Sequence, residues 1–111
     1  MGYMAHHAIV VTSYNKKLII KAHTFAKKFC TNVTEITSPA MNSYRSFMVA
    51  PDGSKEGWEE SDQGNRDRNN FIEWLNKQKY EDGSSALKWV EVMFGDDDDR
   101  ASLVRHNGEN E

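Results

Sequence analysis

The spacing of apolar residues changes several times along this chain, and the order of these changes constrains the fold. A run rich in β-branched residues at 6–12 (HHAIVVT) is typical of a strand. Ser13 and Asn15 then offer side chains that cap a helix. From residue 16 to 29 apolar residues recur on one helical face, and lysines occupy the rest of the surface. The first part of the chain therefore predicts a strand followed by an amphipathic helix.

The same alternation is repeated in the second part of the chain. Two short β-type runs, 32–37 and 44–50, are separated by a Pro-containing break and precede a Pro-Asp-Gly turn. A second helix is predicted over residues 66–79. A final strand is predicted over 87–94. The apolar residues on the inner faces of the two helices predict one core, with the following members: Phe25, Phe29, Phe71 and Leu75.

The resulting series of strand, helix, strand, strand, helix and strand predicts a ferredoxin-like α+β fold, βαββαβ. We expect an antiparallel four-stranded sheet with two helices on one face. This would make a single domain of residues 1–95, followed by an acidic, disordered tail at 96–111. Such a fold hosts many unrelated activities, so function has to be argued from particular residues.

Charge and composition exclude several function classes. The net charge of −3 is the sum of +5 over residues 1–50 and −8 over residues 51–111, and it disfavours nucleic acid as a partner. The 44–50 strand also lacks the spaced aromatics of RNA-recognition modules. No apolar run reaches the roughly 18 residues of a membrane span, and no secretory signal is recognisable. Cys30 is the single cysteine, which rules out an internal disulfide. These features predict a cytoplasmic protein that does not contact membranes.

A polar stretch at 51–65 is the first candidate for a binding site, because loops of that length are uncommon inside compact domains and are often functional. Trp58 lies in its middle among acidic residues. We expect this loop to lie at one end of the domain together with the 80–85 turn and the tail, so that acidic residues form one pole. The predicted ligand- or partner-binding residues are Trp58, Glu59, Glu60, Asp62, Arg66 and Arg68. Two alternatives stay open: Trp58 could instead fold back over an edge of the core, and the two arginines could turn inward to hold a nucleotide phosphate.

No catalytic motif, metal site or cofactor site is predicted. The chain lacks spaced Cys/His pairs for zinc, and the run of four aspartates at 96–99 is typical of a solvated segment. Cys30 follows the first predicted helix, where the negative end of the helix dipole raises a thiol pKa, so an inert thiol is expected. A small hydrolase or nucleotide-processing enzyme with its site at the acidic pole stays as the alternative to a binding module.

The sheet face not covered by helices is the second candidate surface. We expect the aliphatic positions of the strands to face the helices, which would leave an apolar set on the other side: Tyr44, Met48, Trp89 and Met93. Contiguous apolar patches, and Tyr, Trp and Met in particular, are characteristic of protein interfaces. This predicts a homodimer through that face, unless the tail or the long loop covers it.

Three segments of the chain carry a family resemblance: 44–47 (YRSF), 50–62 (APDGSKEGWEESD) and 80–85 (YEDGSS). With them, residues 4–95 resemble small uncharacterised proteins encoded by tailed bacteriophages and prophages. The resemblance implies a host-cell cytoplasm and an accessory role, exerted by binding a host protein or a small ligand. It assigns no role to individual residues. The functional hypothesis from the sequence is therefore a non-enzymatic binding module.

Overall fold

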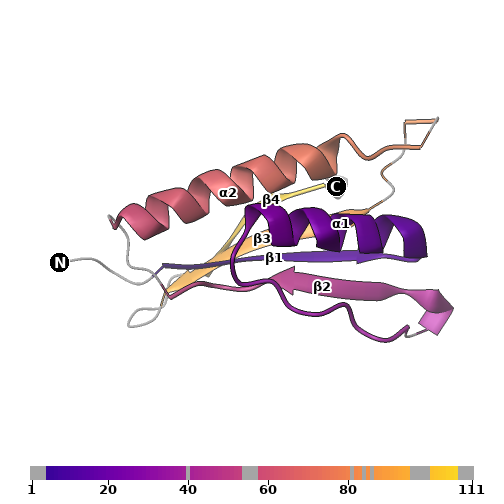
Figure 1. The fold of residues 1–111 in the computed structure, drawn as a ribbon, viewed down its shortest axis with the longest axis horizontal. Coiled ribbons are helices and arrows are strands. Elements are labelled where there is room, and N and C mark those ends of the chain that lie inside the picture. Colours follow the sequence, from indigo (N-terminus) through magenta and orange to yellow (C-terminus); the bar gives the residue numbers. More distant parts are fainter. Residues whose placement is uncertain are drawn as a thin grey trace.

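A computed structural model gives the structure of the chain and describes residues 5–39, 41–53, 58–80, 82–83, 85, 87–95 and 101–107, without the side chain of Ser61. Two layers are evident, a sheet and a pair of helices that lie over one of its faces (Figure 1). The strands are β1 (Ala5–Ser13), β2 (Arg45–Val49), β3 (Lys88–Gly95) and β4 (Ala101–His106). The helices are α1 (Lys16–Phe29), α2 (Glu59–Asn76) and the short 3₁₀ turn η1 (Met41–Ser43).

The strands form one sheet in the order β2-β1-β3-β4, and each neighbouring pair is antiparallel. The predicted ferredoxin-like α+β class, with four antiparallel strands and two helices, is therefore confirmed. The fourth strand of the sheet is β4, and the predicted strand at 32–37 is not part of it.

Residues 32–37 were expected to form a regular strand, and this prediction is wrong. The segment lies beside β2 and is joined to it by a single bridge between Val33 and Val49 and by a few hydrogen bonds. The N–H of Met48 donates to the side-chain oxygen of Thr34, at 2.9 Å, and not to a backbone carbonyl. Thr37 accepts the N–H of Ser46 in the same way, at 3.1 Å. Because threonine side chains take the place of backbone acceptors, no continuous ladder forms.

Part of the predicted disordered tail is the strand β4, so that prediction is wrong for residues 101–107. β4 pairs with β3 along an antiparallel register that contains one irregularity, between Glu91 and Val92. Asn107 then continues the pairing with its side chain, which accepts the N–H of Trp89 at 3.0 Å and donates to the carbonyl of Leu87 at 2.6 Å. The acidic runs 96–100 and 108–111 lie outside the described residues.

Helix α2 begins at Glu59, seven residues before the predicted start, so residues 59–65 of the expected 51–65 loop are helical. The first turn of α2 carries Glu59, Glu60 and Asp62, since the positive end of the helix dipole favours acidic side chains there. The first two turns of α2 are largely exposed and have no apolar face. The helical periodicity that marks the later part of α2 is therefore missing from its beginning.

The predicted placement of the 80–85 turn at the acidic end is also wrong. A helix of 18 residues spans roughly 27 Å, so the two ends of α2 lie at opposite ends of the sheet. The hydroxyl of Tyr80 accepts a hydrogen bond from the side chain of Asn15 at 3.2 Å, which places this turn beside the start of α1. Tyr14 and Tyr44 meet edge to face at the same end, with ring centroids 5.9 Å apart.

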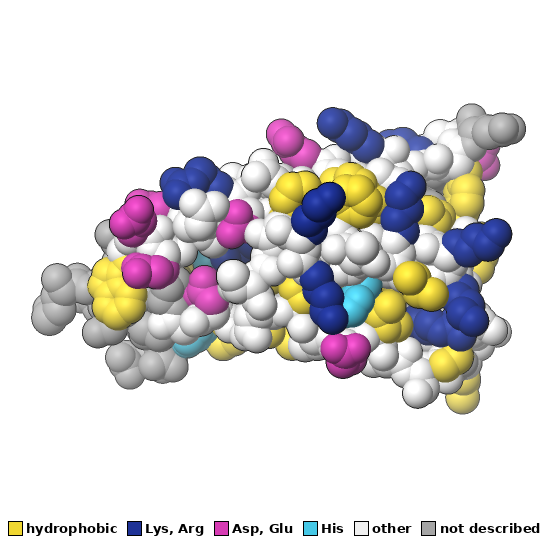
Figure 2. Space-filling model, in the orientation of Figure 1, with side chains coloured by type: hydrophobic (Ala, Val, Ile, Leu, Met, Phe, Trp, Pro, Cys, Tyr) yellow, Lys and Arg dark blue, Asp and Glu magenta, His cyan; other side chains and the backbone are white. Residues whose placement is uncertain are grey.

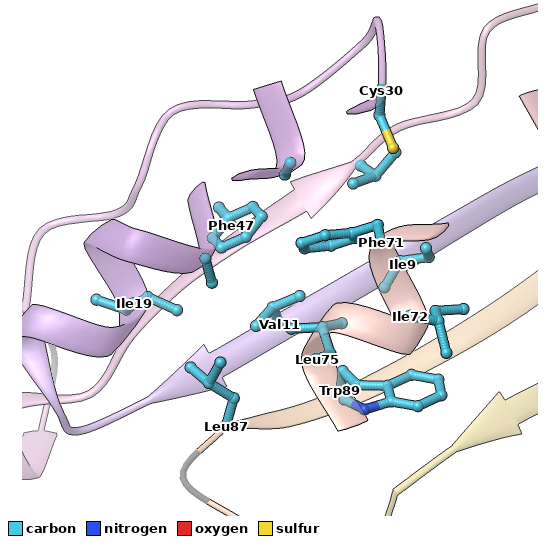
Figure 3. Close-up of a cluster of buried hydrophobic side chains, with 13 residues drawn as sticks. Ile9, Val11, Ile19, Cys30, Phe47, Phe71, Ile72, Leu75, Leu87 and Trp89 are labelled. Carbon is cyan, nitrogen blue, oxygen red and sulfur yellow. The ribbon is translucent and has the colours of Figure 1, made fainter. Parts of the chain in front are cut away.

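The core lies between the helices and the sheet (Figure 3). Phe71 and Leu75 of α2 are buried at its centre, as predicted, against Ile9 and Val11 of β1. Phe25 and Phe29 are partly buried and pack against this cluster from its border. Phe25 stacks on Trp74 with ring centroids 4.5 Å apart, which ties α1 to α2.

The alternation of side chains along β3 is the reverse of the predicted one. Paired residues of neighbouring strands lie on the same sheet face, and Trp89 pairs with Val11, which is buried in the core. Trp89 is therefore a core residue, 5% exposed, and Met93 points to the same, helix-covered side. Met48 lies on the uncovered side as expected. Tyr44 precedes β2 and contacts Tyr14.

We use the term open face for the sheet side opposite the helices. Its described members follow from strand register and alternation: His6, Ala8, Val10, Thr12, Ser46, Met48, Lys88, Val90, Val92, Phe94, Ala101, Leu103 and His106.

Candidate functional site

The amino end of α2 borders a hollow of about 590 Å³. The described residues that line it come from the end of α1, the turn after β2 and the first turns of α2: Thr31, Asp52, Gly53, Trp58, Glu59, Glu60, Gln63, Gly64 and Asp67. In the space-filling view, acidic side chains gather around a large apolar one at this end, whereas most basic side chains lie toward the other (Figure 2). We call this feature the acidic hollow.

Trp58 is the residue immediately before α2 and forms one wall of the acidic hollow. Its backbone carbonyl accepts the N–H of Asp62 at 3.1 Å, which starts the helix, while its side chain makes no capping hydrogen bond. The residue is 49% exposed and does not belong to the core cluster. This exposure does not agree with the alternative in which Trp58 folds back over the core.

The carboxylates of the acidic hollow come from two parts of the chain. Glu59, Glu60 and Asp67 project from α2, and Asp52 follows β2 in a turn that Gly53 completes with a φ of 79°. Asp52 lies close against α2, because a Cβ atom added at Gly64 would be 3.1 Å from its Oδ2 atom. Glycine at position 64 thus allows Asp52 to lie against α2, which supplies most of the other residues of the hollow.

The predicted arginines are not among the residues that line the acidic hollow, although Nη1 of Arg68 lies beside Gly64 at its border. The guanidinium of Arg66 donates to Gln63 at 2.8 Å, and the amide of Gln63 in turn donates to Asp67 at 2.8 Å. Arg68 is buried, hydrogen-bonds Asn65 and lies 3.3 Å from a carboxylate oxygen of Glu91. Neither arginine, nor any lysine, is among the described lining residues. The structure therefore brings together Trp58, Glu59 and Glu60 from the predicted set, and leaves Asp62, Arg66 and Arg68 outside.

A second polar cluster, which the sequence interpretation missed, lies between α2 and the sheet. Glu91 of β3 is 1% exposed, and Arg105 of β4 donates to it from Nε at 2.7 Å. Arg68 and His7 lie 3.3 Å and 3.6 Å from its other oxygen. Burial raises the pKa of Glu91, but the contacts with His7, Arg105 and Arg68 outweigh that effect and hold the pKa below its ordinary value. The sequence signal for this cluster was a glutamate at the centre of a predicted strand. It was missed because the predicted alternation of β3 placed Glu91 on the uncovered face of the sheet.

Cys30 follows α1 and is buried, and it lines a smaller hollow that shares Thr31, Asp52, Gly64 and Asp67 with the acidic hollow. Burial, together with the negative charge of Asp67, raises the pKa of its thiol to about 11, and Arg68 offsets only part of this. The direction agrees with the sequence-based prediction of an inert thiol, although burial replaces the helix dipole as the main cause.

Over the part of the chain that the structure describes, no three His, Cys, Asp or Glu side chains converge closely enough to hold a metal ion. Within the same described residues, no helix is both long and apolar enough to cross a membrane. A comparison with protein-family models, curated proteins and solved structures found no match. The geometry and charge of the site therefore carry the functional conclusion.

Proposed function

We propose that this protein is a binding module whose acidic hollow takes a cationic group, the side chain of a lysine or arginine on the surface of a basic partner protein. One observation carries the proposal: a half-exposed indole shares a hollow of about 590 Å³ with four carboxylates, and no lysine or arginine is among the described residues that line it.

The chemistry of the walls suits such a ligand. A cation placed over the face of a tryptophan gains about 0.5–2 kcal/mol from the ring quadrupole. Charge-assisted hydrogen bonds to carboxylates such as Glu59 and Glu60 add to this attraction and orient the group. The volume lies within the range of about 300–1,000 Å³ that is common for small ligand sites.

The same geometry favours binding over the alternative hydrolase. A hydrolase that works with paired carboxylates needs two of them aimed at one reacting bond or water. In the acidic hollow Asp52 comes from the turn after β2, whereas Glu59 and Glu60 come from the first turn of α2, and among the described residues no contact pairs two of these carboxylates. If the resemblance to phage accessory proteins holds, the basic partner belongs to the host cell.

The proposal is tested by titrating the protein with a short arginine-rich peptide in a calorimeter at low salt. The test variants are Trp58→Ala and the double change Glu59→Gln with Glu60→Gln. The matched control is Glu73→Gln, which removes one charge from an exposed position further along α2, outside the hollow. We expect each test variant to bind at least about tenfold more weakly, a loss of about 1.4 kcal/mol, while Glu73→Gln binds as the wild type does.

Two outcomes would contradict the proposal. If Glu73→Gln weakens binding as much as the test variants do, only the net charge of the protein attracts the peptide. If the wild-type protein binds the arginine-rich peptide no better than an acidic peptide of the same length, the hollow does not recognise cations.

A further inference from the structure

We infer that the open face of the sheet is an interface on which a second copy of this chain packs, sheet against sheet. This surface lies on the other side of the sheet from α2 and is independent of the acidic hollow, so it adds an assembly to the proposed binding function. The residues that form it differ from those expected from the sequence, because Trp89 and Met93 point into the core.

The open face exposes large apolar side chains on three neighbouring strands. Val10 of β1 is 38% exposed, Phe94 of β3 is 42% exposed, and Leu103 of β4 is 57% exposed. Val10 and Leu103 border a shallow hollow of about 360 Å³ together with Val90. His6 and Phe94 extend the same surface, with ring centroids 5.0 Å apart. Contiguous apolar surface of this kind is characteristic of interfaces and is uncommon on monomers.

The charges of the open face suit a copy of itself. Although 28% of the chain is Asp, Glu, Lys or Arg, Lys88 is the one such residue among the described members of this face, and it lies at the end of β3. Two identical faces can therefore meet over their centres without opposing like charges. A basic or acidic partner would find no complementary charge there, whereas an apolar face buries equally well against its own copy.

The strand β4 makes the face large enough for a weak dimer. Four strands at a spacing of about 4.8 Å are roughly 19 Å wide, and about seven residues along each strand span roughly 23 Å. The face therefore measures roughly 440 Å² in projection, or about 900 Å² for two copies, and its corrugated accessible area is larger. Specific, stable interfaces bury a total of about 1,200 Å² or more. The open face lies near this lower limit, so we expect a weak dimer with a dissociation constant in the micromolar range.

The alternative in which the chain's own tail covers the open face does not hold for the described part of that tail. Residues 101–107 extend the sheet at its edge beside β3 and do not cross it. Leu103 thus adds apolar surface to the open face, where a covering segment would have removed it.

Sedimentation velocity over about 1–300 µM tests the inference, a range chosen to bracket a micromolar dissociation constant. The test variants are Leu103→Asp and Phe94→Ser, both at exposed positions, with a reducing agent present throughout. The matched control is Ile20→Asp, an apolar residue of α1 that is 46% exposed on the opposite side of the molecule from the open face. Circular dichroism verifies that each variant is folded.

We expect the wild type and Ile20→Asp to shift from 12.7 kDa toward twice that mass with increasing concentration. The two test variants should stay monomeric over the range, with a dissociation constant raised by at least about tenfold. A wild type that is monomeric at about 300 µM overturns the inference. So does a dimer that survives in the folded test variants or is lost in Ile20→Asp, since the contact would then lie elsewhere. If Leu103→Asp does not fold, Phe94→Ser decides between these outcomes.

Discussion

The carboxylate of Glu91, buried under α2, accepts a hydrogen bond at 2.7 Å from Nε of Arg105 on the neighbouring strand β4. The two residues are paired across the ladder, so the contact holds the last strand to the centre of the sheet. Arg68 approaches the same carboxylate from α2, which connects helix and sheet at one buried charge. The cluster therefore links three elements that are far apart in the sequence.

Replacing Glu91 by glutamine should lower the free energy of unfolding by about 3–5 kcal/mol at neutral pH, because Arg68 would be left as an uncompensated buried charge. Urea denaturation followed by circular dichroism measures this change. Glu73→Gln, at an exposed site on α2, is the control and should change stability by less than about 0.5 kcal/mol.

The contribution of Glu91 should also depend on pH in a defined direction. Its pKa in the folded protein lies below the ordinary value of 4.5, so the folded state binds its proton more weakly than the unfolded state does. The stabilisation is thus fully present above about pH 5 and is lost as the pH falls through the folded pKa. We expect the stability difference between the wild type and Glu91→Gln to shrink below pH 4. A difference that stays constant from pH 7 to pH 3 would show that Glu91 does not titrate in this way.

Asn107 should control the fraying of β4. Replacing it by alanine leaves the backbone N–H of Trp89 and the carbonyl of Leu87 without their side-chain partners, at a cost of about 1–3 kcal/mol. Hydrogen exchange measured by NMR should show faster exchange of the Trp89 amide. Asn107→Asp keeps the acceptor for that amide and should preserve part of its protection. Unchanged exchange in Asn107→Ala would contradict the assigned role.

The two phenylalanines at the centre and the border of the core should differ in their effect on stability. Phe71 is fully buried, so Phe71→Ala should cost about 3–5 kcal/mol, the range for large cavities in cores. Phe29 is partly buried at the border and should cost about 2 kcal/mol. Urea denaturation of both variants measures the order. Wild-type stability in Phe29→Ala would show that the end of α1 does not contribute to the core.

Cys30 should react slowly with a thiol reagent while the protein is folded. Its pKa of about 11 lies two units above the ordinary value of 9.0, so at pH 8 the thiolate is about 100-fold less abundant than in the unfolded chain. Burial slows the reaction further. The rate of alkylation by iodoacetamide at pH 8, with and without urea, measures the ratio. Similar rates in the two conditions would contradict the buried, protonated thiol.

Local patterns in the sequence were sufficient to predict the helices and strands whose apolar faces are continuous. The helical spacing from Leu18 to Phe29 predicted α1, and the β-branched run predicted β1. Asn15 was among the predicted capping residues and does accept the N–H of Leu18, at 3.1 Å. The alternation of strands and helices was enough for the α+β class, although one predicted strand, 32–37, is replaced in the sheet by β4.

The start of α2 and the strand β4 could not be predicted in this way. The first turns of α2 are exposed, so they carry acids suited to the helix dipole and no apolar stripe. β4 has mostly exposed side chains and follows an acidic run, so its composition resembles that of a disordered tail. Its pairing depends on contacts with β3 through Arg105 and Asn107, which no local pattern reveals.

The sequence by itself determined the α+β class and the helix α1, because these follow from local periodicity, and its residue chemistry supplied candidate side chains for a binding site. Only the tertiary structure decided which of them meet. Because of the direction of α2, Trp58, Glu59 and Glu60 line the same hollow as Asp52, and the 80–85 turn lies at the other end of the sheet. The register of β3 with β1 turned Trp89 into the core and Phe94 outward, since a shift of one residue exchanges the two faces of a strand.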